Sequence, residues 1–185
     1  MSKVQKSDLV DISTINPRII LDIRYATTNN FTKQKIYDSP KCYARKHVAL
    51  KLDAVQKELE KQVPRLGLKI WDVYRPLSAQ KKMWAVMPDQ RYVMPPEKGS
   101  RHNRGCAVDL TLVDKNGNEL EMPTEFDTFT KQAHRDYMDL PSHVIKNRQL
   151  LEDVMVKHGF VGMPTEWWHF DDVDWKKYDL LDISI

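Results

Sequence analysis

The segment SRHNRGCAVD, residues 100–109, contains two side chains that commonly bind metal ions. His102 and Asp109 stand seven residues apart, with Gly105 between them. If CAVDLTL forms a strand, alternation places Asp109 on the face opposite its apolar neighbours. His102 then needs a turn or bulge at Gly105 to reach the same side. The spacing permits a metal site, but it equally permits an ordinary turn histidine and an aspartate on a solvated strand.

A second pair lies in TEWWHF, residues 165–170, where Glu166 and His169 flank two tryptophans. A carboxylate and an imidazole are costly to bury in so apolar a run unless they have partners. One interpretation is a histidine hydrogen-bonded within an aromatic core, with a glutamate at the entry of the strand. The alternative is zinc, because two histidines and one carboxylate form a common catalytic ligand set that leaves one position for water. That set would be His102, Asp109 and His169.

Two further residues could supply chemistry beside such a metal. Glu166 is close in sequence to His169 but is not an obvious fourth ligand, and a free carboxylate next to a metal-activated water can act as a general base. Arg75 ends WDVYR directly before a proline, where its guanidinium could project into a cleft and stabilise a developing oxyanion. A surface arginine paired with Asp72 or Glu97 is the alternative.

The elements that must position these residues follow from hydrophobic periodicity and from turn residues. They indicate an α+β domain with a small antiparallel sheet flanked by helices. We expect strands over residues 17–26, 68–75, 105–114 and 160–171, helices from Val48 to about Val63, from Ser78 to Met87 and from Ser142 to His158, a loop over 87–99 and a turn over 114–120.

Bulk properties limit the functional classes. The chain has 185 residues, which predicts a single domain over 1–185, and its net charge of +3 comes from interspersed charges. Nucleic-acid binding would favour a clustered basic stripe, which is absent. No apolar run is long enough to cross a bilayer, and MSKVQKSDLVDIS lacks the features of a secretory signal, so we expect a cytoplasmic protein without membrane contact. Cys42 and Cys106 are too few for a disulfide framework and are predicted to be reduced, partly buried thiols.

The two segments together resemble a known signature. Residues 100–109 match the pattern SxHxxGxAxD, and residues 166–169 match ExWH. Further similarity lies in LDIRYATTNNFT and DVYRPLSAQ, so the resemblance spans roughly residues 9 to 175. The chain is thereby identified as similar to the zinc D,D-peptidases related to the VanX-type D-alanyl-D-alanine dipeptidases.

This resemblance implies hydrolysis of the dipeptide D-Ala-D-Ala to two D-alanines, in a small α+β, hedgehog-like fold with the metal in a narrow cleft. It implies one zinc ion per chain held by His102, Asp109 and His169, with Glu166 as general base and Arg75 polarising the scissile carbonyl. It also implies polar groups that bind the ammonium of a small dipeptide. The matching positions are Tyr25, Ser100 and Asp127, with Glu125 and Asp139 as neighbouring acidic alternatives for the last.

Two alternatives share the zinc site. One is a D,D- or L,D-carboxypeptidase that acts on peptidoglycan stem peptides, and the other is a non-catalytic zinc-binding module. The short chain without a cell-wall-binding module favours the dipeptide, and the presence of both Glu166 and Arg75 favours an enzyme. The sequence does not indicate an oligomeric state. His47, His134, His143 and His158 are predicted to play no part in metal binding.

Overall fold

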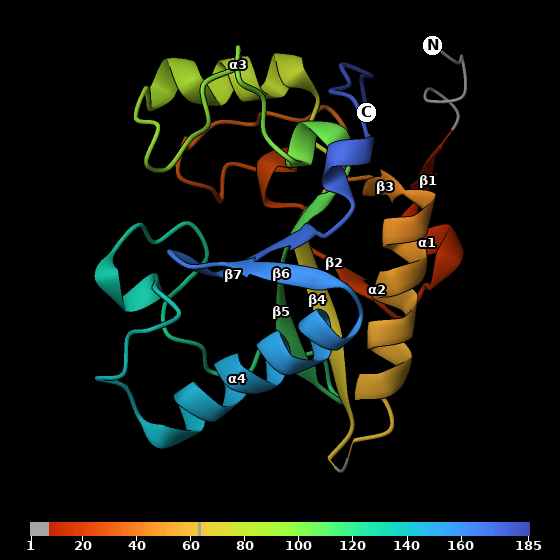
Figure 1. Ribbon diagram of the computed structural model, residues 1–185, viewed down its shortest axis with the longest axis vertical. Coiled ribbons are helices and arrows are strands. Elements are labelled where there is room, and N and C mark those ends of the chain that lie inside the picture. Colours follow the sequence, from red (N-terminus) through yellow and green to blue (C-terminus); the bar gives the residue numbers. More distant parts are fainter. Residues whose placement is uncertain (1–7, 63) are drawn as a thin grey trace.

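A five-stranded sheet with the order β2-β4-β5-β7-β6 forms the centre of the protein (Figure 1). The computed structural model describes residues 8–62 and 64–185. Neighbouring strands are antiparallel except β2 and β4, which are parallel. The strands are β2 (Ile20–Leu21), β4 (Leu66–Asp72), β5 (Ala107–Asp114), β6 (Phe160–Met163) and β7 (Glu166–Asp172). The α+β class is therefore confirmed, with one parallel pair added to the expected antiparallel sheet.

Helices and a second, two-stranded sheet surround this centre. The longer helices α2 and α4 contact each other and the large sheet, and the small sheet pairs β1 with β3. The remaining elements are α1 (Ile12–Ile15), α2 (Lys46–Leu59), α3 (Leu77–Val86), α4 (Ser142–Lys157), β1 (Leu9–Asp11), β3 (Tyr43–Arg45) and short 3-10 turns over Arg24–Ala26, His102–Arg104, Lys131–Ala133 and Trp175–Lys177. Along the described residues, no helix combines the length and the apolar character that a bilayer crossing requires.

The sequence periodicity locates α2 and α4 well. Val48, Leu52, Val55 and Leu59 are spaced for one helix face, and all four are fully buried. The expected end near Val63 is too late, because α2 ends at Leu59, and Val63 itself lies outside the described residues. For both α3 and α4 a proline, not the expected serine, occupies the position before the first turn.

The expected strand over residues 17–26 is mostly wrong. Only Ile20–Leu21 pairs with β4, and the chain then turns through Arg24–Ala26. The polar residues that follow explain the turn, because Asn30 donates its side-chain amide to three backbone carbonyls between Arg24 and Gln34. Such side-chain bonds to the backbone compete with strand pairing.

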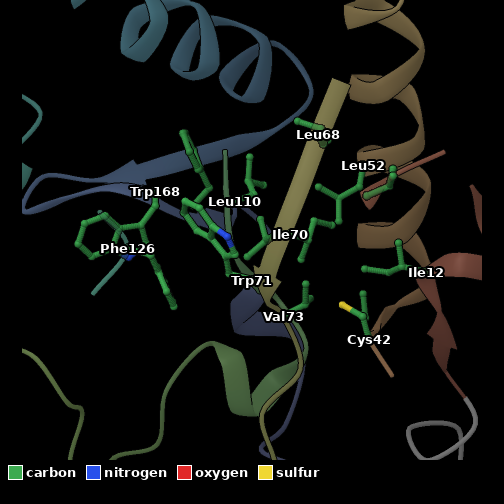
Figure 2. Close-up of a cluster of buried hydrophobic side chains, with 14 of the residues drawn as sticks. Ile12, Cys42, Leu52, Leu68, Ile70, Trp71, Val73, Leu110, Phe126 and Trp168 are labelled. Atoms are coloured by element: carbon green, nitrogen blue, oxygen red, sulfur yellow. The ribbon is translucent and has the colours of Figure 1, made fainter. Parts of the chain in front are cut away.

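The core extends over both sides of β4 (Figure 2). Leu52 of α2 packs on one side, whereas Trp71, Phe126 and Trp168 gather on the other, where Trp71 stacks on Phe126 with ring centres 4.9 Å apart. The face of β5 that carries Asp109 is therefore covered, so Asp109 is only 3% exposed although it lines a cavity. Cys42 and Cys106 are buried and free, as expected.

A tight turn at Gly105 brings His102 to the same side of the sheet as Asp109. Gly105 ends the His102–Arg104 turn in the left-handed conformation, with φ +69°. A Cβ at this position would lie 3.0 Å from Leu9 Cδ2 and 3.3 Å from the backbone nitrogen of Arg45. Both the backbone angles and the lack of space therefore require glycine here.

We predict that Gly105→Ala lowers the free energy of unfolding by about 1–2 kcal/mol, because the left-handed conformation penalises a Cβ. Urea denaturation followed by circular dichroism measures the change. Gly105→Asn separates the two causes, since asparagine tolerates the left-handed conformation better than alanine. A smaller loss than for alanine assigns the cost to the backbone angles, and an equal or larger loss assigns it to the lack of space for a Cβ. An alanine variant with the wild-type midpoint would contradict this account of the turn.

Candidate metal centre and cleft

Three ligand groups converge at the edge where β5 and β7 meet. His102, Asp109 and His169 each offer one donor atom, and these atoms lie within 4.8 Å of one another. His102 Nε2 is 3.3 Å from Asp109 Oδ2, and His169 Nδ1 is 3.0 Å from Asp109 Oδ1. The antiparallel register places Asp109 directly opposite His169, so two of the three groups are fixed by one pair of strands.

The outer hydrogen bonds determine which ring nitrogens are available. His102 Nδ1 lies 2.7 Å from the carbonyl oxygen of Val73, which can only accept, so the proton resides on Nδ1 and Nε2 presents a lone pair. In the same way His169 Nε2 donates to Asp171 Oδ1 at 3.0 Å, which leaves Nδ1 as the inward-facing donor atom. Both tautomers are those that metal binding requires.

The three inward-facing atoms are all electron-pair donors, so the site attracts positive charge. His102 Nε2 and His169 Nδ1 are only 3.3 Å apart. Burial disfavours a charge on His169, but the bonds to Asp109 and Asp171 outweigh it and raise the pKa of His169 to about 10. Burial likewise opposes ionisation of Asp109, yet His102 and His169 hold the pKa of that carboxyl well below its usual range. Two imidazoles and one carboxylate with these tautomers fit a catalytic transition metal such as zinc.

Glu166 lies beside the three ligand groups without joining them. Its Oε2 is 3.9 Å from His169 Nδ1, and its side chain is 12% exposed. Burial and the neighbouring Asp109 raise the pKa of Glu166 to about 7, although His169, His102 and Arg75 act in the opposite direction. A carboxylate with a pKa near neutrality can both accept and return a proton.

Arg75 is buried in the same cleft and is held rigidly. Its guanidinium makes two bonds to Asp72 Oδ2, at 3.0 and 2.6 Å, and a third to Gln80 Oε1 at 3.0 Å. The hydroxyl of Tyr37 donates to the other oxygen of Asp72 at 2.7 Å. The predicted pairing with Asp72 is therefore present, but Arg75 is 7% exposed and is not a surface residue.

One cavity of about 280 Å³ is lined by all of the residues that the sequence singles out for the site. They are Tyr25, Arg75, Ser100, His102, Asp109, Asp127, Glu166 and His169. The guanidinium carbon of Arg75 lies 5.1 Å from the centre of the Tyr25 ring.

A hydrogen-bonded polar pair, Tyr25 and Asp127, also lines this cavity. The Tyr25 hydroxyl donates to Asp127 Oδ2 at 2.9 Å, and burial followed by the charge of Asp109 raises the pKa of Asp127 to about 8. Ser100 Oγ accepts from the backbone N–H of His102 at 3.2 Å. Of the acidic alternatives, Glu125 lines a different cavity and Asp139 is exposed. Asp127 is therefore the one among the three that reaches this cleft.

Sequence reasoning missed several residues that orient the site. Asp171 follows His169 by two residues, so strand alternation places both on one face, and this spacing could have identified it. Asn103, which occupies a variable position of the motif, is fully buried and donates to the carbonyl of Arg75 at 2.9 Å. Gln80 had no sequence signal, because its role depends on the path of α3.

Comparison with known proteins places this cleft in a family. The profile of peptidase family M15, described as D-Ala-D-Ala dipeptidase, matches residues 5–181. The chain belongs to this family. It is consequently a metallopeptidase, and M15 peptidases depend on a metal.

Similar members of the family share most of their length with this chain. It is 38% identical over 176 residues to the D-alanyl-D-alanine dipeptidase of Escherichia coli K12, covering 95% of this chain and 90% of that protein. The proteins of the same name from Enterococcus faecalis and Streptomyces coelicolor are each 30% identical, and the matches cover 83% and 80% of this chain and 85% and 83% of those proteins. A solved structure of the LdcB LD-carboxypeptidase has a TM-score of 0.47 and 21% identity, covering 95% of this chain and 72% of that one.

We predict that Asp171→Asn weakens metal binding about 10- to 100-fold, because an outer carboxylate fixes the tautomer of a ligating histidine and raises its basicity. Competition with a chromophoric chelator measures the affinity. Asp174→Asn is the matched control, since Asp174 is a partly exposed carboxylate in the same segment that pairs with Lys177. Equal affinities for wild type and Asp171→Asn would refute the role of this bond.

Proposed function

We propose that the protein is a zinc-dependent dipeptidase that hydrolyses D-Ala-D-Ala to two D-alanines. The shared name of the similar proteins supports the substrate. The observation that carries the proposal is that one small cavity is lined both by the three groups that could hold a metal and by the pair of buried Tyr25 and half-buried Asp127. Such a cavity can bind the ammonium of a small peptide and the carbonyl to be cleaved at the same time.

His102, Asp109 and His169 would hold the zinc ion in this proposal. A bound zinc ion supplies a Lewis acid, which acidifies water and polarises a carbonyl group. The outer partners of the ligands, the Val73 carbonyl and Asp171, keep both imidazoles in the ligating tautomer and orientation.

We assign to Glu166 the proton transfers of the hydrolysis. Its carboxylate accepts a proton from the water that attacks the peptide carbonyl, and then delivers that proton to the leaving nitrogen. The pKa of about 7 supports both steps, because neither protonation state of Glu166 is strongly disfavoured near neutral pH.

We assign to Arg75 the role of stabilising the negative charge that develops on the carbonyl oxygen. Its guanidinium is held in place by Asp72 and Gln80 before the substrate arrives, so it need not reorganise as the oxygen becomes negative. Asp127 and the Tyr25 hydroxyl bind the free ammonium of the dipeptide, with Ser100 at the rim of the same cavity.

We expect the purified protein to release D-alanine from D-Ala-D-Ala, to lose this activity after treatment with a chelator, and to regain it with zinc. A coupled D-amino-acid oxidase assay measures the release, and metal analysis follows the zinc content. A chelated, metal-free protein that retains full activity would exclude the metal from the reaction. Zinc binding without any release of D-alanine would refute the dipeptide substrate.

Variants separate catalysis from metal binding. Glu166→Gln should reduce kcat by about 100-fold or more, and Arg75→Ala should reduce it by about 100- to 1000-fold, while both retain zinc. His169→Ala should lose the metal together with the activity. Parallel measurement of kcat and bound zinc tests all three, and a Glu166→Gln variant with wild-type kcat would show that another group is the base.

A further inference from the structure

A second cavity adjoins the metal cleft. It has a volume of about 430 Å³, against about 280 Å³ for the cavity that holds the ligand groups. The two cavities share four lining residues: Arg91, Tyr92, Phe129 and Glu166. Because Glu166 lines both of them, the second cavity begins directly beside the group assigned to proton transfer.

An aromatic pair stands between the two cavities. Tyr92 belongs to the loop after α3, at the top of Figure 1, and Phe129 belongs to the segment between β5 and α4, at the left. The rings stack with centres 4.7 Å apart and an interplanar angle of 28°. Phe31 supports Phe129 edge-on at 5.7 Å, and the Arg91 guanidinium lies 5.3 Å from the centre of the Tyr92 ring.

We propose that the Tyr92–Phe129 stack determines the length of peptide that the cleft accepts. This inference rests on the proposed dipeptidase function. A substrate that reaches both Asp127 and the metal ligands lies in the first cavity, and the two stacked rings form part of its lining. A peptide with one more residue needs additional room, and the adjoining cavity has the same two rings in its lining.

The ring of Tyr92 can be removed without disturbing its loop. Tyr92 is 37% exposed, so its side chain contributes little to the core. The loop is held by other groups: the backbone N–H of Val93 donates to the Asp89 carbonyl, the Val93 side chain is buried, and Gln80 donates to the Met94 carbonyl. Tyr92→Ala is therefore expected to fold normally and to open the wall between the cavities.

The second cavity has a basic lining, which indicates the kind of extension it favours. Lys131 and His134 line it, and among the described residues neither makes an ion pair. Arg91 also lines it but is paired with Asp89. A longer peptide whose added residue carries a carboxylate is thus better matched to this space than one with a neutral residue.

The test compares kcat/KM for D-Ala-D-Ala with that for the tripeptides L-Ala-D-Ala-D-Ala and L-Glu-D-Ala-D-Ala, in the zinc-loaded protein. We expect Tyr92→Ala to raise the tripeptide-to-dipeptide ratio about tenfold or more, with the larger gain for the glutamyl peptide. Tyr92→Phe is the matched control, because it keeps the stacked ring, and its ratio should equal that of the wild type.

Three results would overturn the inference, and they can be told apart. If the wild type cleaves the dipeptide but Tyr92→Ala leaves the ratio unchanged, the stack does not set the length, and the dipeptidase function stands. If the wild type cleaves neither class of peptide, the proposed function fails and the inference fails with it. A wild type that cleaves tripeptides as well as the dipeptide would also refute the role of the stack.

Discussion

The convergence of three electron-pair donors in a buried place is the constraint on which the rest of the structure depends. His102, Asp109 and His169 bring their inward-facing atoms to about hydrogen-bonding distance of one another, and without a metal ion the raised pKa of His169 keeps a proton between His169 Nδ1 and Asp109. The fold holds this arrangement through bonds on the far side of each imidazole, to the Val73 carbonyl and to Asp171. Strand register, the turn at Gly105 and these outer bonds therefore serve one purpose, which is to keep the donors directed inward.

The same cleft brings charges of both signs together. Asp109, Glu166 and Asp127 contribute three carboxyls to its lining, and Arg75 is one of the cationic side chains that also line it. Because Arg75 is already paired with Asp72, its charge is largely compensated before any substrate enters. The raised pKa values of Glu166 and Asp127 follow first from burial and then from the neighbouring carboxylate of Asp109.

The sequence predicts most of the site but only part of the fold. For helices with a clear apolar stripe, such as α2 and α4, the predicted ends lie within a few residues of the observed ones, because burial of the stripe determines where the helix forms. The strand expected over residues 17–26 forms only in part, because hydrogen bonds from the Asn30 side chain to the backbone override the preference of branched residues for strands. The pairing of Arg75 with Asp72 is predicted, although as a surface contact, whereas Gln80 escapes detection because its role arises only when α3 packs beside Arg75. The contact between Tyr92 and Phe129 joins two loops and has no periodic signal at all.

The place of β7 in the sheet has a consequence for how the protein matures. β7 is the last strand in the sequence, yet it lies between β5 and β6 and supplies His169 to a site begun at His102. During synthesis, His102 and Asp109 emerge long before their partner, and domains acquire their non-local pairings only once the required segments are available. A nascent chain therefore carries an incomplete set of these donors until residue 169 has been synthesised. A product truncated before His169 lacks the full set.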